Sequence, residues 1–232
     1  MLSFTNGKDI VDVSEKEVMK MVILYEIAPR SPVLCKFAIE LMDNVPSYFW
    51  YESASGSGKT HPLHDLGEGG LARHSLMTYR WLKALLDGSI VDLYEYVPAM
   101  VIATLFHDCC KRGLPTQQPS EHTLFEHPLL SAKFIMDKSQ EFLKNNKDFI
   151  DSTSEDEEYF KEQVAIIASC IQSHMGKWNT NKSSTEIVLP LPKNNMQYVV
   201  HLADYCSSRK FTTFDLTFFN DIFNQTNKGE NK

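Results

Sequence analysis

The sequence predicts an all-α fold. Apolar residues recur at helical spacing in most segments, and helix-start signals precede several of these segments. The composition, 43% hydrophobic and 23% charged residues, is that of a globular chain rather than a disordered one. A length of 232 residues suits a single domain with small appendages.

The first fifty residues are expected to form helices that pack on the rest of the chain. Residues 14–17 read Ser-Glu-Lys-Glu, which has the pattern of a capping box, and apolar residues follow at helical spacing through Tyr25. Ser31 and Pro32 supply a helix cap and a first-turn proline before the apolar stretch 33–42. We therefore treat residues 1–50 as an N-terminal helical segment.

A polar, glycine-rich loop at residues 51–70 precedes the main run of helices. No repeat or linker divides the chain after this point, and residues 51–224 are taken as one domain followed by a disordered tail at 225–232. The acidic stretch 147–158 is interpreted as a solvated turn. The helices are expected at residues 71–86, 98–110, 128–145, 157–174, 195–210 and, as a short last piece, 211–223.

Charge, apolar runs and cysteines exclude several classes of protein. The net charge of −7 argues against broad binding of duplex DNA. No apolar run reaches the length of a membrane span, and the N-terminus lacks the pattern of a secretory signal. The five cysteines are scattered and odd in number, which argues against a disulfide framework and against a thiolate zinc site. We expect a cytoplasmic protein.

The segment Gly56 to Thr60 reads Gly-Ser-Gly-Lys-Thr and superficially matches the end of a phosphate-binding P-loop. That motif also requires a glycine at position 53, where this chain has Ser53, and a helix immediately afterwards, where it has Pro62. A flexible loop is the favoured interpretation.

Histidines and aspartates give the strongest functional signal. His107 and Asp108 follow the apolar run 101–106, and two polar groups at the end of a buried helix are costly unless they are paired or ligated. Imidazole and carboxylate together suit divalent first-row ions. Further groups of this kind stand at helix ends or within apolar segments, namely His74, His127, His174 and Asp204. Separate core residues are the alternative, but convergence on one metal site is the more economical explanation.

The order His74, His107-Asp108 and Asp204 resembles the H…HD…D signature of the HD-domain metal-dependent phosphohydrolases. Residues 69–76 resemble the GGLxxHxL segment of a branch that includes HD-type 3′–5′ exoribonucleases, and residues 107–111 and 173–176 resemble its HDxxK and SHHG elements. The likeness covers roughly residues 61–210. It implies an HD-domain helical bundle with additional N-terminal helices, without the oligonucleotide-binding domain of that branch.

The resemblance also implies a ligand set and a reaction. Asp108 would bridge one or two divalent ions (Mn, Fe, Ni, Zn or Mg), and a metal-activated hydroxide would attack phosphorus. Lys111 would face the substrate phosphate; its alternative is a solvated lysine at a helix end. The implied metal ligands are His74, His107, Asp108, His127, His174 and Asp204.

Four further residues are candidates for the surroundings of this site. His201, three residues before Asp204, is either a hydrogen-bonding partner of that carboxylate or a core histidine. Trp178 is a candidate to stack on a base, and its alternative is the core. Arg73 and His64 are candidate substrate-binding residues, with plain surface positions as the alternative.

The leading hypothesis is therefore a metal-dependent phosphohydrolase acting on a phosphomonoester or phosphodiester of a nucleotide or short nucleic acid. The acidic balance favours a small nucleotide over a long RNA. Three alternatives stay open: a metal-containing nucleotide sensor with little turnover, a di-iron oxygenase with the same six ligands, and a structural helical protein.

Overall fold

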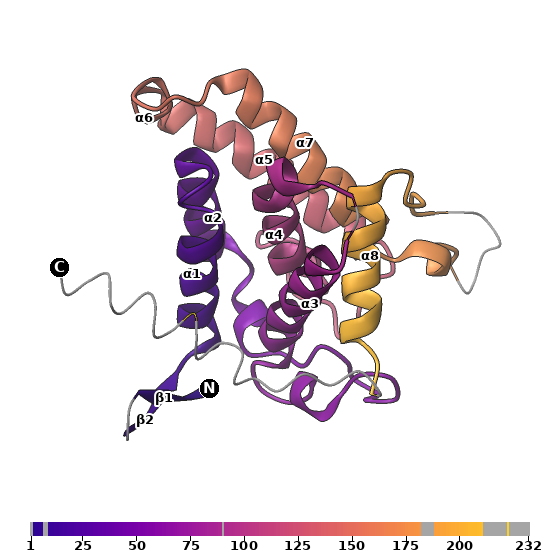
Figure 1. The fold of residues 1–232 in the computed structure, drawn as a ribbon. Helices are drawn as coiled ribbons and strands as arrows, with labels where there is room; N and C mark the ends of the chain where they lie inside the picture. Colours follow the sequence, from indigo (N-terminus) through magenta and orange to yellow (C-terminus); the bar gives the residue numbers. More distant parts are fainter. Residues whose placement is uncertain (1, 7–8, 90, 182–187, 211–221, 223–232) are drawn as a thin grey trace.

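The structure is a computed structural model that describes residues 2–6, 9–89, 91–181, 188–210 and 222 (Figure 1). Eight α-helices lie within these residues, which confirms the predicted all-α class. The expected helix at 211–223 and tail at 225–232 lie outside the described residues, apart from Ile222, which is buried.

The chain begins with a hairpin rather than a helix. Strands β1 (Leu2–Asn6) and β2 (Asp9–Val13) pair in antiparallel register, with Leu2 opposite Val13. The expectation of helices from the first residue is wrong for this stretch. The sequence carries part of a hairpin signal there, because Gly7 follows a short run of alternating polarity, Leu2 to Thr5.

The two N-terminal helices start where the sequence predicts. Helix α1 (Glu15–Glu26) has a complete capping box, in which the Ser14 hydroxyl accepts from the Glu17 amide and the Glu17 carboxylate accepts from the Ser14 amide. Helix α2 (Pro32–Asn44) begins with its proline, and the Ser31 hydroxyl accepts from the Leu34 amide at 3.0 Å.

The remaining helices follow the predicted order with small shifts at their ends. The long ones are α3 (Gly70–Asp87), α4 (Val97–Phe106), α5 (His127–Asn145), α7 (Glu157–Ser173) and α8 (Asn195–Ser207). Helix α6 (Lys147–Asp151) occupies part of the stretch that we interpreted as a turn. Short 3₁₀ turns complete the description: η1 (Ser47–Trp50), η2 (Leu63–Asp65), η3 (Tyr94–Tyr96) and η4 (Gly176–Trp178).

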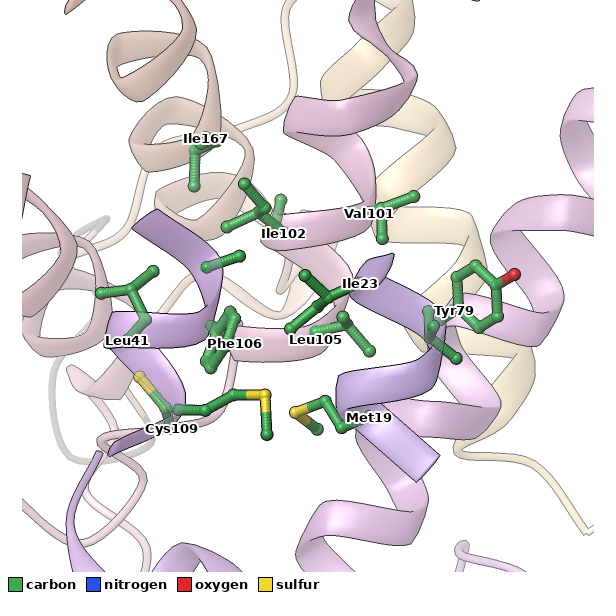
Figure 2. Packing of buried hydrophobic residues seen from close by; sticks show 14 of the residues in the cluster. Met19, Ile23, Leu41, Tyr79, Val101, Ile102, Leu105, Phe106, Cys109 and Ile167 are labelled. Atoms are coloured by element: carbon green, nitrogen blue, oxygen red, sulfur yellow. The ribbon is translucent and has the colours of Figure 1, made fainter. Parts of the chain in front are cut away.

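Helix α4 is the central, buried helix of the bundle. All ten of its residues are buried, and it packs against α1, α3, α7 and α8 (Figure 1). Figure 2 shows Leu105 and Phe106 of this helix among Met19 and Ile23 of α1 and Leu41 of α2. Because α3 also packs on α8, and α5 on α7, the end of α4 lies where several helices converge. No helix of the described residues is long and apolar enough to span a membrane.

Truncation of Leu105 tests this central position. Leu105→Ala is expected to lower the free energy of unfolding by about 2–5 kcal/mol, because the side chain is fully buried and its removal leaves a cavity. Chemical denaturation measures the change. Leu24→Ala is the matched control on an exposed position of α1 and is expected to change stability by about 0.5 kcal/mol or less. Equal effects of the two substitutions would contradict the described packing.

Candidate metal centre

Six side chains from five helical segments meet at one place, and we call this group the metal centre. His74 lies in α3, His127 is the first residue of α5, and Asp204 lies near the end of α8. The rest follow helix ends directly: His107 and Asp108 after α4, and His174 after α7. All are buried except the Asp204 side chain, which is 16% exposed. The structure therefore brings together every ligand that the sequence predicts.

One half of the metal centre is formed by His74, His107 and Asp204. The Asp204 Oδ1 atom lies 3.1 Å from His74 Nε2 and 3.5 Å from His107 Nε2. These three residues offer ligand atoms close enough to share one ion. The Asp108 Oδ2 atom faces the same group, 3.6 Å from His107 Nε2 and 3.9 Å from His74 Nε2.

The other half is formed around the second oxygen of Asp108. Its Oδ1 atom lies 2.9 Å from His127 Nε2 and 3.6 Å from His174 Nε2. His107, Asp108 and His174 form a second group that could hold an ion. Because each oxygen of Asp108 faces a different set of imidazoles, this carboxylate could offer one ligand oxygen to each of two ions.

Three of the histidines are oriented by the same device. The Nδ1 atom of His107 bonds to the carbonyl of Thr104 at 2.8 Å, that of His127 to Leu124 at 2.7 Å, and that of His174 to Ile171 at 2.8 Å. In each case the carbonyl belongs to the residue three positions earlier. A carbonyl oxygen can only accept, so Nδ1 carries a proton in each ring. In the neutral form of the ring, the lone pair of Nε2 therefore faces the centre.

This arrangement of lone pairs fits a cation. The Nε2 atoms of His127 and His174 face one another at 3.3 Å, and in the neutral form of each ring, with the proton on Nδ1, neither has a proton there. Nearby, His107 Nε2 and Asp108 Oδ1 are buried and have no hydrogen-bond partner. Buried acceptors that face each other without a donor are costly, and a divalent ion with imidazole and carboxylate ligands satisfies them.

The charge states also suit metal binding. Burial raises the pKa of Asp108, but Lys111 and the imidazoles of His107 and His127 outweigh it and hold that pKa well below its ordinary value. Burial lowers the pKa of His174 to about 3, with help from His107. Metal ligands must be deprotonated, and both groups are so at neutral pH.

His74 and Asp204 form a more strongly coupled pair. Burial lowers the pKa of His74, but the carboxylates of Asp65 and Asp204 outweigh it and raise the pKa to about 10. Burial raises the pKa of Asp204, whereas the neighbouring imidazoles of His107 and His74 bring it well below its ordinary value. Without an ion, a proton on His74 balances the two carboxylates, and a bound cation would take its place.

A cavity of about 500 Å³ opens above the metal centre. Lys111 lines it, with Nζ 2.5 Å from Asp108 Oδ2, so the ammonium lies beside the centre. Trp178 lines it as well; the residue is 40% exposed, and its ring stacks on Tyr205 with centroids 5.2 Å apart. The Arg209 guanidinium lies 4.3 Å from the Tyr205 ring centroid. Part of the segment 54–60, which includes the P-loop-like sequence, lines the cavity too.

Three predicted neighbours of the site lie differently from expectation. Arg73 and His64 are not among the residues that line the cavity. The Arg73 guanidinium donates to Glu15 and to the carbonyls of His64, Leu66 and Glu68, so it ties the loop before α3 to the N-terminal part of the protein. His201 lines the cavity, but its Nδ1 donates to the His174 carbonyl at 2.6 Å instead of to Asp204.

Two residues that the sequence did not single out also belong to this region. His61 lines the cavity, and Asp65 is completely buried between His61 and His74. Both stand in a segment without hydrophobic periodicity, so no helical pattern relates them to the other ligands. The only local signal was the His64-Asp65 dipeptide ahead of the two glycines.

Comparison of the chain with protein-family models, with curated proteins and with solved structures finds no match.

Metal uptake by the two halves of the centre can be measured directly. His174→Ala is expected to reduce the bound metal by about one ion per chain relative to the wild type, if both halves are filled, because it removes an Nε2 ligand from one half only. His122→Ala, on an exposed loop, is the matched control and should leave the metal content unchanged. Elemental analysis after loading with Mn²⁺ or Zn²⁺ gives the result. Equal metal content in all three proteins would contradict ligation by His174.

Proposed function

We propose that this protein is a metal-dependent phosphohydrolase of the HD type that acts on a phosphate ester of a nucleotide or short nucleic acid. The observation that carries the proposal is the set of inward-facing Nε2 lone pairs around Asp108, at the floor of an open cavity. The predicted order of ligands along the chain and their convergence in a helical bundle are consistent with this class.

The residues of the metal centre would have different roles in ester hydrolysis. One or two divalent ions, when bound, would activate water as a nucleophile and offset charge on the phosphoryl oxygens. His74, His107 and Asp204 would hold one ion, His127 and His174 the other, and Asp108 would contact both. All of these ligands except His107 line the floor of the cavity, so a phosphate ester would enter from the open side.

Lys111 adds a positive charge next to that floor. Its ammonium contacts Asp108 and the side chain is 12% exposed, so it lies between the carboxylate and the open cavity. A lysine there would bind a phosphoryl oxygen as a point charge. The contact with Asp108 limits how far Nζ can move. The ammonium would therefore stay close to a phosphate held over the metal centre.

The walls of the cavity favour a nucleotide as the organic part of the substrate. Trp178 and Tyr205 provide an aromatic wall, and stacking of a base on such rings is favourable for any base. The hydroxyls of Ser55, Ser57 and Thr60 line the same cavity and can hydrogen-bond to a sugar. A volume of about 500 Å³ is within the usual range of small-molecule sites.

Replacement of the bridging carboxylate tests the reaction. Asp108→Asn is expected to lower the rate of Mn²⁺-dependent hydrolysis by about three orders of magnitude or more, because the loss of a shared ligand affects both ions. Assay of phosphate release from a panel of nucleotides and short oligonucleotides measures it. Asp137→Asn, at an exposed position of α5, is the control for loss of one carboxylate. Tight nucleotide binding by the wild type without product would favour the sensor instead.

A second prediction separates binding from chemistry. Lys111→Met is expected to raise KM for a nucleotide by about tenfold or more, because a charge-assisted contact with phosphate is lost while the metal ligands stay in place. Lys133→Met, an exposed lysine on α5, is the matched control. Steady-state kinetics with Mn²⁺ measure both. An unchanged KM and kcat in Lys111→Met would place the substrate phosphate elsewhere.

A further inference from the structure

His74 cannot be oriented in the way that the other three histidines of the centre are. It lies inside α3, four residues after the first residue Gly70, where the preceding carbonyls accept helical hydrogen bonds. The other three stand at or next to helix ends and bond to a carbonyl three residues earlier. On His74, Nδ1 instead faces Asp65 Oδ2 at 3.2 Å and the Ser207 hydroxyl at 3.3 Å.

We propose that Asp65 is a positioning residue for the metal centre. Asp65 holds His74 so that the proton is on Nδ1 and the lone pair of Nε2 points toward the ion. The inference rests on the proposed metal centre and adds a residue to it. A carboxylate can only accept, so the proton between the two groups belongs to Nδ1. An anionic partner at Nδ1 also makes Nε2 more basic than a carbonyl partner does, so Nε2 is a stronger ligand for a metal ion.

Asp65 is itself fixed by the surrounding chain. Its side chain is fully buried, and Oδ2 also accepts from His61 Nδ1 at 2.9 Å. The backbone of Asp65 lies against the start of α3, where a Cβ on Gly70 would clash with the Asp65 carbonyl oxygen. Only glycine permits this approach. The Asp65 carbonyl also accepts from the Ala54 amide at 3.0 Å, which anchors the turn on its other side.

A competing role for Asp65 is direct ligation. His61, Asp65 and His74 lie close enough to share an ion through Nδ1 of His74. A neutral imidazole has one lone pair, so an ion there would exclude one at His74 Nε2. The Nε2 side is the better site, because His107 Nε2 and Asp204 Oδ1 lie there and His107 Nε2 has no hydrogen-bond partner of its own. The geometry therefore favours Asp65 as the partner of a ligand and not as a ligand.

The test is the affinity for Co²⁺, measured by competition with a chromophoric chelator. Asp65→Asn is expected to weaken Co²⁺ binding about tenfold to hundredfold and to change the d–d absorption of the bound ion, because a neutral amide replaces the anionic partner of His74. Glu26→Gln is the matched control. Glu26 is a buried carboxylate of α1 that bonds to Tyr79, and its replacement should leave the Co²⁺ affinity within about twofold of the wild type.

A measurement on the wild type makes the inference independent of how well the variant folds. In the Zn²⁺-loaded protein with ¹⁵N-labelled histidine, His74 should show a protonated Nδ1 and a metal-bound Nε2. Metal at Nδ1 of His74 would overturn the inference, as would equal Co²⁺ affinity of Asp65→Asn and wild type, or an equal loss in Glu26→Gln.

Failure of the hydrolase proposal gives a different pattern. Wild-type protein that binds Co²⁺, loses affinity in Asp65→Asn and hydrolyses no phosphate ester supports the positioning role and overturns only the proposed activity. Wild-type protein that takes up neither Co²⁺ nor Zn²⁺ overturns both, because His74 is then no ligand.

Discussion

The whole arrangement depends on one electrostatic constraint: acceptor atoms of three imidazoles and two carboxylates face each other where the helices converge, with His74 beside them. In three of the rings Nδ1 donates to a backbone carbonyl, so the single proton of the neutral ring is on Nδ1. Their Nε2 atoms are then acceptors and cannot form hydrogen bonds with one another. The contact between His127 and His174 shows the problem most plainly. A cation is the simplest resolution, and the carboxylates of Asp108 and Asp204 supply the charge that a divalent ion requires.

The backbone at and next to the helix ends orients three of the histidines in the metal centre. The carbonyls of Thr104 and Ile171 lie in the last turns of α4 and α7, and that of Leu124 lies in the turn before α5. Each accepts from Nδ1 of the histidine three residues later. The entirely buried α4 fixes the place of His107 and Asp108, and the pairs α3–α8 and α5–α7 bring the other ligands to it. Hydrophobic packing thus supplies the energy that holds acceptors together against their mutual repulsion.

The surroundings of the centre are asymmetric in a way that suits a substrate. One side is closed by helices, whereas the other opens into a cavity with Lys111, an aromatic wall and a hydroxyl-bearing segment. Part of the segment that superficially matched a P-loop lines this cavity. It lacks the strand immediately before it and the helix immediately after it that a P-loop has. Residues in it contribute through their place in the fold and not through the motif.

The sequence by itself determined the helical class, most helix boundaries and the six candidate ligands, because hydrophobic periodicity, caps and the His-Asp pattern are local properties. Capping at Ser14 and Ser31 and the His107-Asp108 pair are examples. Only the tertiary structure decided the partners of those ligands. His201 bonds to the His174 carbonyl, Arg73 is held by Glu15 and loop carbonyls, and Asp65 reaches His74 from a turn without periodicity. Such contacts depend on how helices distant in sequence pack together, which no local spacing encodes.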